Sequence, residues 1–294
     1  MTAAVGDLLS GAIAALREGG SPTPRLDAEL LLAHATGRDR SWLLAHPEAD
    51  VSANGFGALL DRRLAGEPIA YLRGFKEWRS LRIRTDARAL IPRPETELLY
   101  ELAVDEIRAR MARDGESIVA WEPATGSGAV TLALALRFRE AISLGRLRLI
   151  ASDISADALE LAAENLEAHG VQRLVDLACA DLLEPAGSTL PRPDVVVANL
   201  PYVPTDEALA PERGLGHEPR VAIDGGTDGL VVLRHLFDML PGSVAPDATL
   251  LLEIGIGQAE AIGALAPPGA SVSVERDLAG VERVVRVRLP GSDP

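Results

Sequence analysis

The most distinctive group of reactive residues follows the apolar run Val195–Ala198, and it consists of Asn199, Leu200, Pro201 and Tyr202. An amide-like NH2 group has two hydrogens to donate, and its nitrogen lone pair is delocalised. The Asn199 side-chain oxygen and the Leu200 carbonyl can accept those two hydrogens. Pro201 fixes φ at the turn, and Tyr202 offers a flat wall to the target group. The pattern predicts alkylation of an amide-like nitrogen, with positioning as the main catalytic contribution.

A second candidate site lies earlier in the chain, where a turn containing two glycines joins an expected strand to an expected helix. Its residues are Glu122, Pro123, Ala124, Thr125, Gly126, Ser127 and Gly128. Glycines at such a turn let the backbone approach a ligand and present amide donors to it, although many tight turns also contain them. Asp153 ends the next expected strand, 25 residues after Gly128. This spacing matches an acid that binds the ribose hydroxyls of an adenosine cofactor; an N-cap for the following helix is the alternative.

A third acid, Asp181, follows the next strand, and Leu182 comes directly after it. The carboxylate can accept from an adenine amino group while Leu182 covers the ring. Taken alone, Asp181 also fits a solvated loop position. Asp181 gains weight because it lies at a third neighbouring strand end, where ligands bind in open α/β sheets.

The elements that position these residues alternate between strands and helices from residue 117 onward. This alternation predicts an α/β fold, a Rossmann-like and mostly parallel sheet covered by helices. Strands are expected at Ser117–Trp121, Arg148–Ala151, Leu174–Ala178, Val195–Ala198, Thr249–Ile254, Ser271–Val274 and Arg283–Leu289, and helices at Val130–Phe138, Ala156–His169, Leu230–Leu240 and Gln258–Leu265.

The preceding part of the chain divides into two segments. Residues 1–74 predict a small all-α domain, since apolar residues recur at helical spacing and no strand pattern is visible. Residues 75–91 alternate like a β-hairpin, with its turn expected at Thr85–Arg88. The Rossmann-like domain is then expected over 92–294. It opens with a helix that has Pro94 in its first turn and continues from Leu98 to Met111. The helical domain has no chemical motif, which indicates a packing or partner-docking role.

Charge and composition exclude several classes of function. The 294 residues carry 43 acids and 29 bases; 10 and 9 of these precede residue 81, leaving 33 and 20 in the later part. Such acidity argues against a general nucleic-acid binder. Cys179 is the single cysteine, which excludes a disulfide and fits a reducing cytoplasm, and the scattered histidines predict no metal site. No apolar run approaches the length of a membrane span.

Together these residues resemble the HemK/PrmC family of S-adenosylmethionine-dependent glutamine-N5 methyltransferases, along nearly the whole chain. The matching segments are Ile91–Glu97 (LIPRPETE in the family), Thr125–Gly128, Asp153–Ser155, Asn199–Tyr202 (NPPY), Glu218–Gly226 with Asp228–Leu230, Leu252–Gly255 with Gln258, and Asp277–Val285. Two positions depart from the pattern: Ala124 replaces the glycine of D-x-G, and Leu200 replaces the first proline of NPPY. Leu182 also stands where a larger side chain is common.

The resemblance implies the cofactor S-adenosylmethionine and, as substrate, the glutamine of the Gly-Gly-Gln loop of class I peptide-chain release factors. The helical domain would help to grip the factor, with no nucleic acid or membrane involved. By position, the methionine part of the cofactor would lie along Ala124, Thr125, Gly126, Ser127 and Gly128. The ribose would lie at Asp153, and the adenine at Asp181 and Leu182. Asn199 would adjoin the cofactor and would hold the glutamine together with Leu200, Pro201 and Tyr202.

Three alternatives remain at this point. A nucleic-acid adenine-N6 methyltransferase needs the same NH2 chemistry but conflicts with the acidic charge. A cofactor-binding relative without turnover is suggested by Ala124 and Leu200. A nicotinamide dehydrogenase is disfavoured because the glycine turn lacks the third glycine of GxGxxG.

Overall fold

The computed structural model describes residues 2–113, 117–209 and 216–291, which form two compact units, 1–76 and 77–294. The first unit is a helical bundle with an apolar core that includes Val5, Leu16, Leu31 and Leu43. Its helices are α1 (Val5–Glu18), α2 (Pro24–Thr36), α3 (Arg40–Ala45), α4 (Phe56–Leu64) and α5 (Ile69–Arg73). The expectation of a unit without strands is wrong, because β1 (Thr2–Ala4) pairs antiparallel with β2 (Asp50–Ser52). Strands of three residues are too short to show an alternating pattern.

A two-stranded sheet follows, formed by β3 (Phe75–Trp78) and β4 (Leu81–Arg84). Its turn lies at Arg79 and Ser80, and not at Thr85–Arg88 as the sequence suggested. Both turn residues adopt left-handed backbone angles, with φ of 49° and 60°. Tight hairpin turns of this hand usually contain glycine or asparagine, so the sequence gives no signal for it.

The second unit is built on a seven-stranded sheet of order β10-β11-β9-β8-β5-β6-β7, with only β11 antiparallel to its neighbours. The α/β Rossmann-like expectation is confirmed, and all seven expected strands form. They are β5 (Ile118–Pro123), β6 (Leu147–Asp153), β7 (Val175–Cys179), β8 (Val195–Ala198), β9 (Thr249–Glu253), β10 (Ser271–Arg276) and β11 (Glu282–Arg288).

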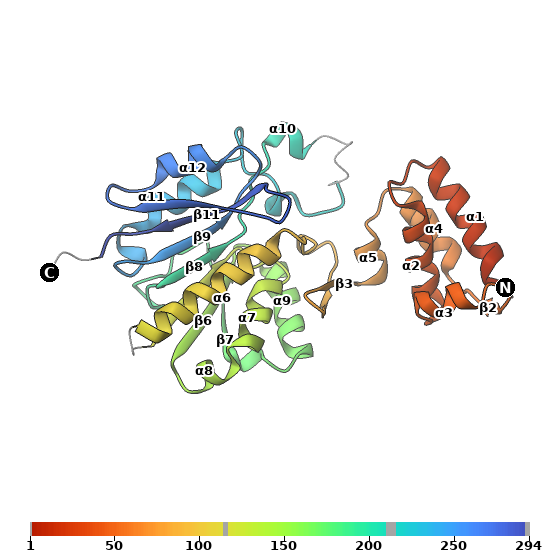
Figure 1. Ribbon diagram of the computed structural model, residues 1–294, viewed down its shortest axis with the longest axis horizontal. Coiled ribbons are helices and arrows are strands. Elements are labelled where there is room, and N and C mark those ends of the chain that lie inside the picture. The colour runs from red at the N-terminus through yellow and green to blue at the C-terminus, as the bar shows by residue number, and fades with distance from the viewer. Residues whose placement is uncertain (1, 114–116, 210–215, 292–294) are drawn as a thin grey trace. The chain divides into compact units, whose positions relative to one another are not determined.

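Helices cover both faces of this sheet, so its central strands are apolar on both sides (Figure 1). The side chains of β8 illustrate this: Val195 and Val197 pack on one face, and Val196 and Ala198 on the other. The first face carries α6 (Thr96–Arg113), α7 (Ala129–Arg137), α8 (Arg139–Ser143) and α9 (Ala156–Ala168); the second carries α11 (Val231–Ser243) and α12 (Ala259–Leu265), and the short α10 (Thr205–Ala208) follows β8.

The strand order reverses between β5 and β8, which lie side by side in parallel. In open α/β sheets, the crevice outside the carboxyl ends at such a reversal is the usual ligand site. The residues that follow β5, β6, β7 and β8 are those that the sequence singled out for chemistry.

Candidate active site

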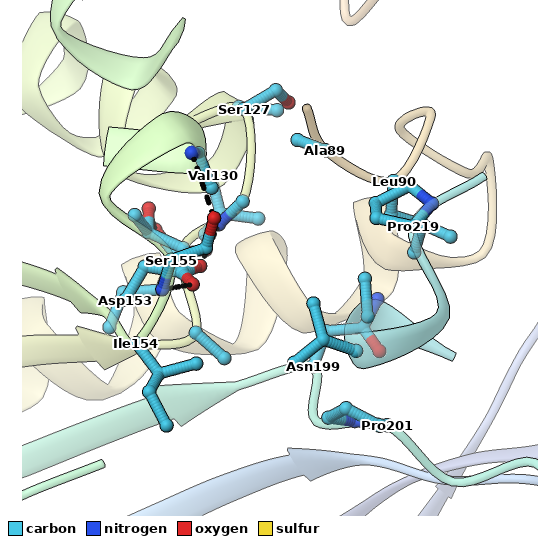
Figure 2. Close-up of a pocket in the computed structure, with 18 of the residues that line it drawn as sticks. Ala89, Leu90, Ser127, Val130, Asp153, Ile154, Ser155, Asn199, Pro201 and Pro219 are labelled. Atoms are coloured by element: carbon cyan, nitrogen blue, oxygen red, sulfur yellow. Dashed lines mark hydrogen bonds between the residues drawn. The ribbon is translucent and has the colours of Figure 1, made fainter. Parts of the chain in front are cut away.

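A cavity of about 370 Å³ lies at the carboxyl ends of β5, β6 and β8. Its volume falls in the range of small-molecule sites, roughly 300–1,000 Å³. Figure 2 shows Asp153 and Ser155 on one side, Leu90 and Pro219 opposite them, and Asn199 and Pro201 along a third side. Nine of the expected site residues line it: Ala124, Thr125, Gly126, Ser127, Asp153, Asp181, Leu182, Asn199 and Pro201.

The turn after β5 takes an unusual backbone path through the cavity wall. Ala124, which stands where the family has glycine, has a φ of 55°. This lies in the left-handed region that favours glycine. Leu182, across the cavity lining, has a φ of 47°. A left-handed conformation costs an L-residue roughly 1–2 kcal/mol. Both residues line the cavity, and backbone strain of this kind is concentrated at functional sites.

Glu122, the last acid of β5, holds the turn from beneath. It is buried, and its Oε2 accepts hydrogen bonds from the Thr125 hydroxyl at 2.9 Å, the Thr131 amide at 2.9 Å and the Thr131 hydroxyl. Burial raises the pKa of Glu122 to about 7, partly offset by these hydrogen bonds. The carboxyl therefore ties the turn to the first residues of α7.

Asp153 joins the ends of β5 and β6. Its Oδ2 accepts from the Gly126 amide at 2.9 Å, and its Oδ1 accepts from the Ser155 amide at 2.9 Å. Ser155 is the N-cap of α9, since its side chain accepts from Ala158; Asp153 does not cap that helix. Burial raises the pKa of Asp153, against the effect of its backbone hydrogen bonds. A carboxylate has about four acceptor positions, which leaves roughly two for a ligand.

Asp181 lines the cavity together with a histidine that the sequence did not connect with it. His235 Nε2, from α11, lies 3.4 Å from Asp181 Oδ2. The two residues are far apart in the chain and neither belongs to a motif with fixed spacing. Only the packing of α11 on the sheet brings them together.

Asn199 emerges from β8 on the same face as α6, because it continues the alternation of Val195 and Val197. Its Nδ2 donates at 3.2 Å to Oγ1 of Thr96, which is the first residue of α6. Within the described part of the chain no hydrogen bond engages Oδ1, which leaves this oxygen available to a donor. Thr96 and Asn199 both line the cavity.

The three remaining expected residues, Gly128, Leu200 and Tyr202, are not part of the cavity lining. Leu200 is 2% exposed and packs in the core against α11, so its side chain anchors the turn. Tyr202 is half-buried, and its hydroxyl donates to Glu253 Oε1 at 3.4 Å. A Cβ at Gly128 would lie 3.0 Å from that of Ala162, so glycine there serves the packing of α7 on α9.

A second layer of contacts fixes the backbone after β8. Gln258 Nε2 donates to the Tyr202 carbonyl at 2.9 Å, and its Oε1 accepts from the Gly255 amide at 2.9 Å. Gly229 has a φ of 74°, and a Cβ there would lie 2.3 Å from the Tyr202 carbonyl oxygen. Two separate segments of the chain therefore meet on the backbone of Tyr202.

The opposite rim of the cavity combines residues 88–96 with residues 219–222. Buried Glu218 connects the two segments: its Oε2 accepts from the Ile91 amide at 2.9 Å, and its Oε1 pairs with Arg93. Both segments match motifs of the family, but the sequence analysis did not predict that they line the site. The match itself was the signal that could have placed them there.

Comparisons with known proteins agree with this arrangement. Residues 7–74 match the family description "PrmC N-terminal domain". The release factor glutamine methyltransferase of Deinococcus radiodurans is 36% identical over 289 residues, covering 97% of this chain and 98% of that protein. The enzyme of the same name from Moorella thermoacetica is 38% identical, covering 88% of each chain.

Among solved structures, the hMettl16 catalytic domain in complex with MAT2A 3'UTR hairpin 6 superposes with a TM-score of 0.50 at 14% identity, over 83% of this chain and 85% of that one. This likeness concerns the fold alone. No helix within the described ranges has the length and apolar character of a membrane span.

Proposed function

Because this chain belongs to the family of release factor glutamine methyltransferases, we propose that it methylates a class I peptide-chain release factor. The acceptor is the side-chain amide nitrogen of the glutamine in the Gly-Gly-Gln loop, and the methyl donor is S-adenosylmethionine. The observation that carries the proposal is the placement of Asn199 in the cavity, with its Nδ2 tethered to Thr96 and its Oδ1 left without a partner among the described residues.

The cavity's residues suit S-adenosylmethionine, which supplies a methyl group on a positively charged sulfur. Asp153 and Asp181 stand at the ends of neighbouring strands, where they can accept from the ribose hydroxyls and the adenine amino group. Residues 124–127 line the remaining wall, beside the methionine part.

Asn199 Oδ1 and the Leu200 carbonyl accept the two hydrogens of the substrate's NH2 group. This holds the amide plane so that the nitrogen faces the methyl carbon. The nitrogen forms a bond to that carbon while the bond from carbon to sulfur breaks, and the electron pair of that bond stays on sulfur as a neutral thioether. The extra proton on nitrogen leaves to water afterwards, so the step needs no strong base. Positioning of this kind supplies several kcal/mol of barrier reduction.

The unit formed by residues 1–76 has the role of gripping the release factor in this proposal. It contains no member of the cavity lining, and it matches the family's N-terminal domain. The acidic character of the later part, 33 acids against 20 bases, supports a protein acceptor over a nucleic-acid acceptor.

Methyl transfer to purified release factor tests the proposal directly. The protein is incubated with S-adenosylmethionine and the factor, and the Gly-Gly-Gln peptide is examined by mass spectrometry. One added methyl group on glutamine is expected, and a factor with that glutamine replaced by alanine serves as the control. Methylation of adenine in an oligonucleotide, with none on the factor, would refute the proposal.

A further inference from the structure

A buried acid, Glu253, lies directly behind the proposed acceptor site and has no part in the chemistry described above. It is 2% exposed, and its Oε2 has no hydrogen-bond partner among the described residues. Parallel pairing of β8 with β9 sets Ala198 beside Leu252, so Asn199 and Glu253 leave the sheet together. Leu251 packs on the face that carries α6, and the alternation along β9 directs Glu253 to that same face.

Two hydrogen-bonded arms connect Glu253 with the residues that leave β8. The Tyr202 hydroxyl donates to Oε1 at 3.4 Å. The Thr96 hydroxyl is also a hydrogen-bonding neighbour that lowers the pKa of the Glu253 carboxyl, while Thr96 Oγ1 accepts from Asn199 Nδ2 at 3.2 Å. Thr96 is 6% exposed, so little water competes for these contacts.

The arm through Thr96 has a direction. A carboxylate has no hydrogen to donate, so it forces the single Thr96 hydroxyl hydrogen to point at Glu253. Thr96 can then only accept from Asn199, which fixes the NH2 end of the Asn199 amide on Thr96 and leaves the oxygen end for the substrate. If Glu253 carried a proton, it could donate to Thr96 instead. The Asn199 amide could then turn over and oppose its own NH2 group to that of the substrate.

We propose that Glu253 is a positioning residue that, through Thr96, sets which end of the Asn199 amide faces the substrate nitrogen. The inference rests on the proposed function for its consequence, but the hydrogen-bond chain itself belongs to the protein without ligands.

The charged groups around Glu253 make the contacts from Glu253 through Thr96 to Asn199 sensitive to pH near neutrality. Burial is the largest influence and, together with Glu95, raises the pKa of Glu253 to about 7, against the effects of Thr96, Tyr202 and Arg283. Arg283 also forms ion pairs with Asp277 at 2.9 Å and with Glu95 at 3.8 Å, which reduces its effect on the pKa of Glu253. The orienting, ionised form of Glu253 therefore becomes more populated as the pH rises through neutrality.

Turnover measurements on variants test the chain of contacts. Thr96→Val removes the hydroxyl while keeping the shape, and we expect kcat to fall roughly tenfold with KM for the cofactor unchanged. Thr96→Ser should recover most of that loss. Glu253→Gln should lower kcat and abolish its rise between about pH 6 and pH 8. The double variant should be no worse than Thr96→Val alone, because both changes break one chain.

Thr249→Val is the matched control, because it removes a buried hydroxyl from the opposite end of β9, where Thr249 bonds to Glu106 at 2.9 Å. It should retain the kcat of the natural protein. If Thr96→Val behaves like this control, or if the effects of the two site variants multiply, the inference is wrong.

A spectroscopic measurement tests the orientation of the Asn199 amide without turnover. The side-chain NH2 signals of Asn199 in 15N-labelled protein, assigned by their loss in Asn199→Ala, should shift as the pH passes neutrality and stop doing so in Thr96→Val. Signals that ignore pH in the natural protein would overturn the inference. A shift combined with no methylation of release factor would leave the positioning role standing and remove the proposed function.

Discussion

The amide of Gly126 donates a 2.9 Å hydrogen bond to Asp153, so the turn after β5 and the end of β6 are fastened together across the floor of the cavity. Asp153 also lines the cavity that this contact shapes. One carboxylate thus both organises the cofactor loop and is proposed to bind the ribose.

Replacing Asp153 with alanine should weaken S-adenosylmethionine binding by roughly 1.5–3 kcal/mol, the usual worth of hydrogen bonds to a charged group. Isothermal titration calorimetry measures the effect. Asp176→Ala is a suitable control, since Asp176 lies on the exposed side of β7, paired with Arg148. An unchanged affinity in Asp153→Ala would remove that residue from the cofactor site.

Replacing Asn199 with alanine should cost roughly 2.7–4 kcal/mol of transition-state stabilisation, by analogy with the loss of one preorganised hydrogen-bonding group. Cofactor affinity should stay nearly the same, because Asp153 and the glycine turn remain in place. Single-turnover methyl transfer gives the rate and calorimetry gives the affinity. A rate equal to that of the natural protein would show that Asn199 does not hold the substrate.

Replacing Ala124 with glycine should increase stability by up to about 1 kcal/mol, because the relief of a left-handed Cβ exceeds the added chain entropy of glycine. Ala133→Gly, in the middle of α7, provides the contrast, since glycine there should destabilise by about 1 kcal/mol. Urea denaturation compares the two. Destabilisation by Ala124→Gly would mean that its methyl group contributes more by packing than its backbone loses to strain.

Replacing Gly229 with alanine should disturb the residues after β8, since its Cβ would lie 2.3 Å from the Tyr202 carbonyl oxygen. Gly257 is the matched control: it has a φ of 83°, and a Cβ there meets nothing within 4 Å. Both variants should lose roughly 1–2 kcal/mol of stability to backbone strain. Only Gly229→Ala should lose kcat as well, and equal kcat in the two variants would contradict the placement of Tyr202.

Stability should fall as the pH rises through neutrality, in part because of Glu122. Its folded pKa of about 7 lies above the ordinary value of 4.5, so the folded protein holds a proton that the unfolded chain has released. Its contribution is therefore complete below the unfolded pKa and is lost as the pH passes the folded one, for a total of about 3 kcal/mol. Urea unfolding at about pH 5 and about pH 8 should show a smaller change in Glu122→Gln. Equal changes would place the titration elsewhere.

The sequence predicted the parts of the site that lie on single strands. Asp153 ends β6 and Asn199 directly follows β8, and parallel strands bring their carboxyl ends to one edge, so local pattern and topology suffice. The links from Thr96 to Asn199 and from Glu253 to Tyr202 could not be predicted in this way. They span 103 and 51 residues and depend on how helix α6 and strand β9 pack beside β8. The pairing of His235 with Asp181 was missed for the same reason.

Leu200 gives the proposed acceptor site a dependence on solvent. A proline ring would hold the backbone torsion of this turn by covalent geometry at every temperature. Here an apolar side chain, 2% exposed against the α11 layer, anchors the turn through exclusion of water. Such anchoring weakens on cooling and in urea. Cold and mild denaturant therefore loosen the very backbone that presents Asn199, and catalytic geometry in this protein is linked to the thermodynamics of its hydrophobic core.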